Sequence, residues 1–478
     1  MQLAIAIRQF FTDLILPKCS KISIEYPYVD TDYLSTYYLH YAKAFRDYRK
    51  ECCRVILYGN AKGKPCVGYV TLRPLSKMHK IGKTYLDPTV FAGNGKYIIC
   101  GNYKIHYEGV ESNIPAMPYM KQEQHVAVCA HVCLWSAIRF FSSRFTNCST
   151  RSLGEIVDRI HSPAERKIPS RGLSLDQISA LLMDAGFSCI ILRRDASVVE
   201  GSPLEEQLLA YLDSGIPVIC ISNTLQHAVI ACGRPTVPEE RTLDADITLI
   251  EEKFPVQDDG VALVLESSLT DGIVVNDDSE LPYHNVTTYP SESFVSDGRF
   301  LKLSQIDYCI VPLESRMVLS YTAAKDIAQF LYLQKDDHGQ YINHWRNDVP
   351  SSETKMHIMK LGLVSSNTFK EWIRESLDKG DLPGEFMTLL EIAYPRFLWL
   401  AEFSSSAEYV DNLCSGFIVL DASCVHGDPA ACLILADNET CNICISPDAE
   451  HEATMRKFKY SHKFQIPLFR KNYKEVHV

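Results

Sequence analysis

Cys129 begins an almost wholly apolar run that extends to Phe141. The run predicts a helix buried on most of its surface, and the polar residues before it predict a loop, so the cysteine should open the helix. The first turn of a helix leaves backbone N–H groups unpaired and carries about half a positive charge, which favours a thiolate over a thiol. Cys129 is therefore a candidate nucleophile. Taken alone, Cys129 and Cys133 also fit a helix core as ordinary small residues.

A predicted strand pair and a further predicted strand downstream supply partners for such a thiol. Residues 216–222 and the strand that begins at His227 predict antiparallel neighbours joined by a short polar turn. A further apolar strand ends in Asn276 and Asp277. A carboxylate or amide at a strand end can hold an imidazole in the tautomer that catalysis needs. Because side chains alternate faces along a strand, only one of the two can point at His227; we expect Asp277, with Asn276 as the alternative.

The order Cys129, His227, Asp277 resembles that of the papain-like cysteine peptidases, and within them the bacteriocin-processing, C39-like branch. In that family the nucleophile opens the central helix and the histidine begins a strand that follows a Gly-x-Pro-Val segment, which residues 215–218 match. The third member lies at the end of a strand of the type Val-Val-Asn-Asp, which residues 274–277 match. The resemblance implies a papain-like catalytic core.

The resemblance also implies a glutamine shortly before the cysteine, whose amide helps to bind the oxyanion. Gln122 is the better match and Gln124 the alternative. Two positions depart from the family pattern: Ala130 replaces a glycine and Asp278 replaces a proline. The resemblance covers about residues 119–283 and leaves both ends of the chain unexplained.

The function implied by the resemblance is hydrolysis of peptide or isopeptide bonds through a thioester, with a Cys–His–Asp triad. The expected substrate is a protein or peptide, and we expect no cofactor and no metal. Two alternatives use the same residues. One is another acyl-transfer enzyme of the same fold, such as an amidase, a deubiquitinase-like enzyme or a transglutaminase-like enzyme. The other is a non-catalytic papain-like binding module.

Length and element order predict the architecture around this core. A chain of 478 residues predicts two to four domains of ~100–200 residues, and three fit best. We expect an N-terminal α+β domain at 1–115, the papain-like catalytic domain at 116–314 and a C-terminal α+β domain at 315–478. Helices followed by a mostly antiparallel sheet make the overall fold class α+β.

Strands of a small N-terminal sheet are predicted at 54–58, 67–72 and 97–100. Arg73 and residues 80–88 are predicted to be exposed loops. An occluding or substrate-guiding role would suit this domain because it immediately precedes Cys129.

Composition and charge exclude other classes of function. The net charge is −11, without a basic cluster interleaved with aromatic residues, so no nucleic-acid partner is expected. No apolar stretch approaches the ~18–20 residues needed to cross a bilayer, so no membrane association is expected. The 17 cysteines lie mostly within apolar segments and no secretory signal is evident, which predicts reduced thiols and a cytoplasmic location. The sequence does not indicate an oligomeric state.

Two further segments carry charge or metal-ligand spacing. Residues 235–260 are strongly acidic and predict a solvated insertion between the histidine strand and the aspartate strand. Cys441 and Cys444 have the spacing of half a zinc site, but no second pair completes it, so core cysteines are favoured.

Overall fold

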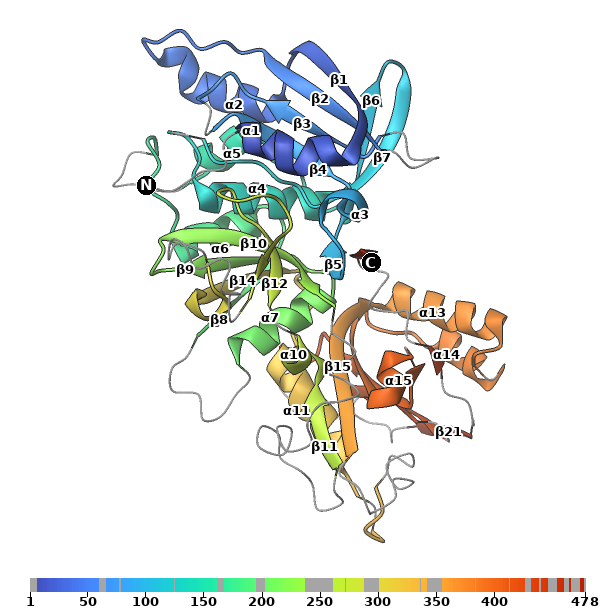
Figure 1. The fold of residues 1–478 in the computed structure, drawn as a ribbon. Coiled ribbons are helices and arrows are strands. Elements are labelled where there is room, and N and C mark those ends of the chain that lie inside the picture. The colour runs from blue at the N-terminus through green and yellow to red at the C-terminus, as the bar shows by residue number, and fades with distance from the viewer. Residues whose placement is uncertain are drawn as a thin grey trace.

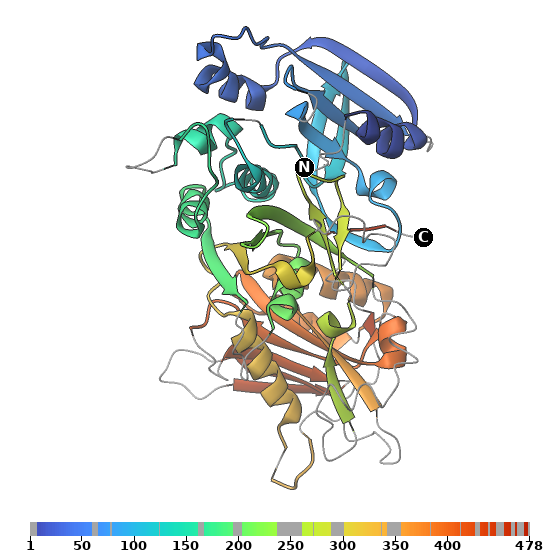
Figure 2. The same ribbon diagram turned by 60° about the vertical axis from the view of Figure 1, so that its left-hand side comes forward.

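The computed structural model of the chain describes residues 7–476, with gaps at 60–65, 77–78, 124, 161–166, 195–202, 237–260, 271, 288–300, 336, 342–354, 383, 412, 426–430, 438–439, 446–453, 460–463 and 466–472. Three units follow one another along the long axis of the molecule, from the N-terminal sheet at the top of Figure 1 to the C-terminal sheet at the bottom. Figure 2 shows the same order from another side. Helices and largely antiparallel sheets confirm the α+β class.

Four antiparallel strands form the N-terminal sheet, in the order β1-β2-β3-β4. They span Cys19–Tyr28, Cys52–Gly59, Gly68–Leu72 and Ile81–Leu86. The strands predicted at 54–58 and 67–72 are thereby confirmed. The hairpin β6 (Gly101–Tyr107) and β7 (Val110–Ala116) lies beside this sheet. The helical segments of the unit are α1 (Ile7–Gln9), η1 (Phe10–Ile15), η2 (Leu16–Lys18), α2 (Thr31–Leu39), η3 (Tyr41–Lys43) and α3 (Pro88–Phe91).

The central sheet carries the predicted histidine and aspartate strands. Its strand order is β13-β12-β10-β9-β14-β8, and every pair along it is antiparallel. The strands are β8 (Ser188–Arg193), β9 (Val218–Ser222), β10 (His227–Pro235), β12 (Ile273–Asn276), β13 (His284–Val286) and β14 (Tyr308–Leu313). The helices are α4 (Cys129–Ser142), α5 (Leu153–Asp158), α6 (Leu175–Asp184) and α7 (Leu204–Asp213), and η6 (Leu303–Gln305) is a short turn.

The helix α4 is the apolar centre of this unit and packs against β9 and β10. Eleven of its residues are buried, including Trp135 and Phe140, which are fully inaccessible. Burial on this scale fixes the helix relative to the sheet, since each large side chain contributes ~1.5–3 kcal/mol when removed from water. The start of α4 is thus held at a constant place beside the sheet.

The C-terminal unit is a sheet in the order β11-β15-β16-β18-β19-β20-β21. Its strands are β11 (Val261–Leu265), β15 (Lys355–Ser365), β16 (Phe397–Ser405), β18 (Gly416–Asp421), β19 (Cys432–Asp437), β20 (Thr440–Ile445) and β21 (Thr454–Lys459). The helices are α10 (Glu266–Leu269), α11 (Tyr321–Leu333), α13 (Ser366–Lys379), α14 (Thr388–Glu391) and α15 (Ser406–Val410), with the turn η7 (Gly384–Met387) and the small ladder β17 (Leu413–Cys414) and β22 (Phe464–Gln465).

Three strands cross the predicted domain boundaries at 115 and 314. β5 (Lys96–Ile99) pairs with β10 of the central sheet, so the prediction that 97–100 belongs to a separate N-terminal sheet is wrong. β23 (Tyr473–Val476) pairs with β5, and β11 pairs in parallel with β15 of the C-terminal sheet. One continuous apolar core joins residues of all three units. Neighbourhood in the sequence therefore did not predict the partners of these strands.

Several predicted features fall in or next to the gaps. Nearly all of the acidic segment 235–260 lies outside the described residues. Cys441 is fully buried in β20. The sixteen cysteines described, from Cys19 to Cys441, are all free thiols. In the part of the chain that the structure describes, no helix is long and apolar enough to cross a membrane.

A buried ionic network ties the central sheet to the C-terminal sheet. Glu266 of α10 is 3% exposed, and its Oε1 accepts hydrogen bonds from Arg234 Nη2 at 2.9 Å and Lys360 Nζ at 3.2 Å. The Tyr409 hydroxyl donates to the same oxygen, and Arg234 Nε also contacts Asp213 Oδ1 at 2.6 Å. Burial raises the pKa of Glu266, but Lys360 and Arg234 outweigh it and lower that pKa to about 2.

We predict that Glu266→Gln lowers the free energy of unfolding by about 3–5 kcal/mol, because it leaves the buried Arg234 and the partly buried Lys360 without their shared carboxylate. Urea denaturation followed by circular dichroism measures the loss. Glu385→Gln, which changes an exposed glutamate of the same sheet unit, should stay within about 0.5 kcal/mol of the unmodified chain. Equal effects of the two substitutions would contradict a structural role for the network.

Candidate active site

Cys129 is the first residue of α4, and its side chain is partly exposed while the helix behind it is buried. Val128 is the N-cap residue, and its backbone N–H donates to His131 Nδ1 at 3.4 Å. Burial lowers the pKa of His131 to about 4, so its neutral ring can accept that bond. The sequence prediction that the cysteine opens the helix is confirmed. Its place in the first turn of a helix favours the thiolate, because the positive end of the helix dipole lies there.

Cys133 differs from Cys129 in that its side chain is buried. It is 3% exposed, and burial raises the pKa of its thiol well above the ordinary value. A thiol of this kind stays protonated and out of reach of a substrate. Of the two cysteines, Cys133 is therefore the one that is an ordinary core residue.

His227 begins β10, and Asp277 follows the last residue of β12, as predicted. His227 Nε2 and Asp277 Oδ1 are 2.9 Å apart, and their side chains are 14% and 9% exposed. The register explains the contact. Ile230 lies opposite Asn276, and directly opposed residues share a face, so continuing the alternation by one residue puts Asp277 on the face of His227. Asp277, and not Asn276, is thus the partner of the histidine.

Asn276 points to the other face and has a structural role. Its side-chain N–H groups lie 3.4 Å from the carbonyl of Met117 and 3.3 Å from that of Pro118. Its Oδ1 accepts from the backbone N–H of Tyr283 at 2.9 Å. The alternative assignment of Asn276 as the residue that orients His227 is therefore wrong.

The electrostatics of His227 favour its charged form. Burial lowers its pKa, but the hydrogen bonds to Asp277 and to Cys129, with the charges of Asp277 and Asp278, raise it to about 11. The imidazole is consequently a cation at neutral pH, and the Cys129 side chain is close enough to be one of the groups that raise its pKa. Because Nε2 is engaged with Asp277, Nδ1 is the ring nitrogen left for the cysteine. Cysteine, histidine and carboxylate thus belong to one site.

Asp277 is held in place from two directions. Its Oδ1 accepts from the backbone N–H of Ser279 at 2.8 Å as well as from His227. Burial raises the pKa of Asp277, but the bond to His227 and its charge outweigh burial and lower that pKa. The carboxylate is therefore ionised and fixed beside the imidazolium.

Asp278 adds a second carboxyl group at the site, where the resemblance leads one to expect proline. Its side chain is 2% exposed, and its Oδ1 lies 3.7 Å from His227 Nε2. Burial and the charge of Asp277 raise the pKa of Asp278 to about 7, and burial and the same charge raise the pKa of Glu280 to about 7. Asp277 is thus the ionised carboxylate of the site, and Asp278 and Glu280 are weaker acids.

His227, Asp277 and Asp278 place ligand-type atoms within 4.8 Å of one another, and theirs is the one such group among the residues described. The hydrogen bond between His227 Nε2 and Asp277 Oδ1 occupies one ring nitrogen of the histidine. The arrangement suits acid–base chemistry with a thiol.

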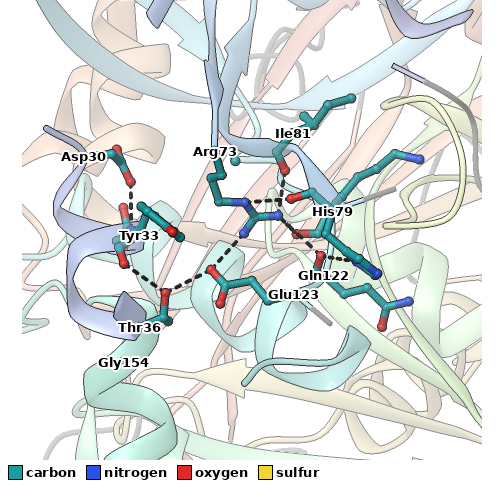
Figure 3. A network of polar contacts seen from close by, with 12 residues as sticks. Asp30, Tyr33, Thr36, Arg73, His79, Ile81, Gln122, Glu123 and Gly154 are labelled. Atoms are coloured by element: carbon teal, nitrogen blue, oxygen red, sulfur yellow. Dashed lines mark hydrogen bonds and ion pairs between the residues drawn. The ribbon is translucent and has the colours of Figure 1, made fainter. Parts of the chain in front are cut away.

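Gln122 lies on the segment that leads to α4 and is partly exposed. Its backbone carbonyl accepts from Arg73 Nη2 at 3.3 Å and lies 3.0 Å from His79 Nδ1, as Figure 3 shows. Gln124, the alternative, lies outside the described residues. The oxyanion role expected of Gln122 stays a prediction.

The residues that fix the segment before α4 were not predicted from the sequence. Arg73 was predicted to lie in an exposed loop, but it is 2% exposed, and residues 81–86 form the buried strand β4; both predictions are wrong. Arginine is rarely fully buried, so a pattern based on hydrophobicity places it outside. The nearest available signal was its position at the end of a predicted strand, beside the segment before the nucleophile.

Comparison of the chain with models of protein families, with curated proteins and with solved structures found no match. The geometry of the site and its chemistry therefore carry the functional argument.

Proposed function

We propose that this protein is a cysteine hydrolase of the papain-like type that cleaves peptide or isopeptide bonds with Cys129 as nucleophile. The observation that carries the proposal is the hydrogen bond between His227 and Asp277, at two adjacent strand ends, beside Cys129 at a helix start, whose side chain contributes to the raised pKa of His227. Such an arrangement provides a nucleophile, a general acid and base, and a residue that orients the base. Each of these side chains is fixed by a rigid element, as efficient catalysis requires.

In the first half of the reaction, the Cys129 thiolate forms a bond to the carbonyl carbon of the substrate. The His227 imidazolium gives its proton to the leaving nitrogen, and the carbon–nitrogen bond breaks to leave a thioester. The backbone N–H of Cys129 and the side chain of Gln122 would donate hydrogen bonds to the oxyanion. Asp277 keeps the ring of His227 aimed at the sulfur throughout.

In the second half, water attacks the thioester carbon and gives a proton to His227, and the carbon–sulfur bond breaks. The acid product leaves, and the ion pair between Cys129 and His227 is restored. Peptide and isopeptide bonds are both amides, so the same steps serve both, and a protein or peptide is the proposed substrate. The chemistry requires no metal and no cofactor.

We place the protein in the cytoplasm, because the sixteen described cysteines are free thiols and the proposed nucleophile must stay reduced. A papain-like arrangement of the central unit accords with α4 lying against an antiparallel sheet that carries the histidine.

We predict selective alkylation of Cys129 by iodoacetamide at pH 7. An ordinary cysteine with a pKa near 8.5 is only about 3% thiolate at this pH, so loss of the imidazolium in His227→Ala should slow alkylation about 30-fold. Peptide mapping by mass spectrometry measures the modified fraction of each cysteine over time. Cys133 serves as an internal control and should stay unmodified in the folded protein. Alkylation of Cys129 no faster than that of an average free thiol would overturn the proposal.

The pH dependence of this alkylation should identify Asp277 as the residue that keeps His227 protonated at neutral pH. Removing the carboxylate in Asp277→Ala lets the pKa of His227 fall from about 11 towards its ordinary value of 6.5. Near pH 5.5 the imidazole is then still protonated and the thiolate retains its partner, so the variant should react almost as the unmodified protein does.

As the pH rises to 7–8, the variant's imidazole loses its proton, and alkylation should become about tenfold slower than in the unmodified protein. Alkylation rates measured across this range provide the test. Asp378→Ala changes an exposed carboxylate of α13 and should leave the profile unaltered. A constant ratio between Asp277→Ala and the unmodified protein at all pH values would contradict the assigned role.

A further inference from the structure

The segment before the nucleophile is attached to the N-terminal sheet as an added strand. Tyr119 forms an antiparallel bridge with Thr84 of β4, with N···O distances of 2.9 and 3.1 Å. The backbone N–H of Lys121 donates to the carbonyl of Ile81 at 3.1 Å. The N-terminal unit therefore determines where the chain lies as it approaches α4.

The guanidinium group of Arg73 donates hydrogen bonds both to this segment and to residues at the start of β4, as Figure 3 shows. Its Nη2 donates to the carbonyls of Lys121 at 2.7 Å, Ile81 at 2.9 Å and Gln122 at 3.3 Å. Its Nε donates to the carbonyl of His79 at 3.0 Å. The guanidinium thus links the end of β3 and the start of β4 to the segment that leads to α4.

The charge of Arg73 is balanced within the same segment. Arg73 Nη1 and Glu123 Oε1 are 3.1 Å apart, with side-chain exposures of 2% and 0%. The Thr36 hydroxyl of α2 lies 3.0 Å from the same oxygen. The backbone N–H of Glu123 donates to the carbonyl of Ala127 at 2.8 Å, which closes the turn just before Cys129. The salt bridge therefore anchors the start of the short connection to the nucleophile, and the backbone bond from Glu123 to Ala127 holds its end.

His79 completes the contacts on Gln122. Burial lowers the pKa of His79, so the ring is neutral, and the proton on Nδ1 can be donated to the carbonyl of Gln122 at 3.0 Å. Two donors from the N-terminal unit thus meet at the backbone oxygen of the one residue whose side chain is assigned to the oxyanion. A backbone fixed in this way limits where that side chain can reach.

We propose that Arg73 is a positioning residue for the oxyanion site, through which the N-terminal unit becomes part of the catalytic apparatus. The inference rests on the proposed function, because it assigns Gln122 as an oxyanion donor. Arg73 acts on Gln122 and not on the sulfur: its contacts stop at Glu123, whereas Cys129 is held by α4 and His227. Loss of the Arg73 contacts should therefore weaken acyl transfer without weakening the thiolate.

Arg73→Lys tests this separation. A lysine can still neutralise Glu123, but one ammonium group cannot replace a fork that binds four carbonyls. Hydrolysis of p-nitrophenyl acetate passes through an oxyanion, and its kcat should fall about 10- to 100-fold. Alkylation of Cys129 by iodoacetamide develops no oxyanion, and its rate should stay within about twofold of the unmodified protein. Gln122→Ala should produce the same split between the two rates.

Arg54→Lys is the matched control. Arg54 lies on β2 of the same sheet and contacts Glu25 at 2.6 Å and the carbonyl of His106 at 3.1 Å, away from the segment before α4. Both rates should stay unchanged in this variant, with circular dichroism and thermal melting as checks that each protein is folded.

The proposal is overturned if Arg73→Lys hydrolyses the ester as fast as the unmodified protein, or if both rates fall together. Should that variant fail to fold, His79→Ala replaces it, since it removes only the second donor to the Gln122 carbonyl. A severalfold loss of ester hydrolysis with unchanged alkylation is then expected, and unchanged hydrolysis overturns the proposal. An unmodified protein that neither alkylates selectively nor hydrolyses the ester would instead overturn the proposed function itself.

Discussion

The hydrogen bond between His227 and Asp277 is the contact on which the candidate site depends, and the register of β10 against β12 determines it. A shift of one residue would turn Asp277 to the opposite face and bring Asn276 to the histidine. On its other side β12 pairs with β13, and Gly272 fixes the approach of these two strands at the start of β12. Its φ is +108°, and a Cβ atom there would lie 2.3 Å from the carbonyl oxygen of Val286. Only glycine permits this close approach of β13, and β12 therefore enters the sheet at a defined point.

A second set of contacts joins the site to the segment that precedes it. The carbonyl of Pro118 accepts from the Ser136 hydroxyl of α4 at 2.8 Å and from Asn276 at 3.3 Å. The Tyr119 hydroxyl donates to the carbonyl of Glu280, beyond Asp277, at 2.8 Å. The helix that carries the nucleophile, the strand that carries the aspartate and the approach to Gln122 thus share one framework. Buried polar groups with satisfied partners specify such an arrangement better than apolar contacts alone.

Local sequence patterns were sufficient to predict the parts of the site that lie on regular elements. The start of α4, the start of β10 and the end of β12 each followed from a nearby apolar run, and the structure brings His227 and Asp277 into hydrogen-bond contact. The partners of β5 and β11 were not predictable in this way, because a strand's pattern records burial and not the identity of its neighbour. The burial of Arg73 was not predicted, for a related reason. Its acceptors come from residues 79–123, and no local pattern shows that a buried arginine will find them.

The path of the chain through the central sheet has a consequence for the order in which the protein can fold. β5, at residues 96–99, lies between β10 and β23 and finds one neighbour near residue 235 and the other near residue 475. On the ribosome, residues emerge in sequence, so β5 must wait for most of the chain before both of its edges are paired. The sheet that carries the histidine is thus completed late in synthesis. A nascent chain would hold its reactive thiol in an unfinished scaffold until that point.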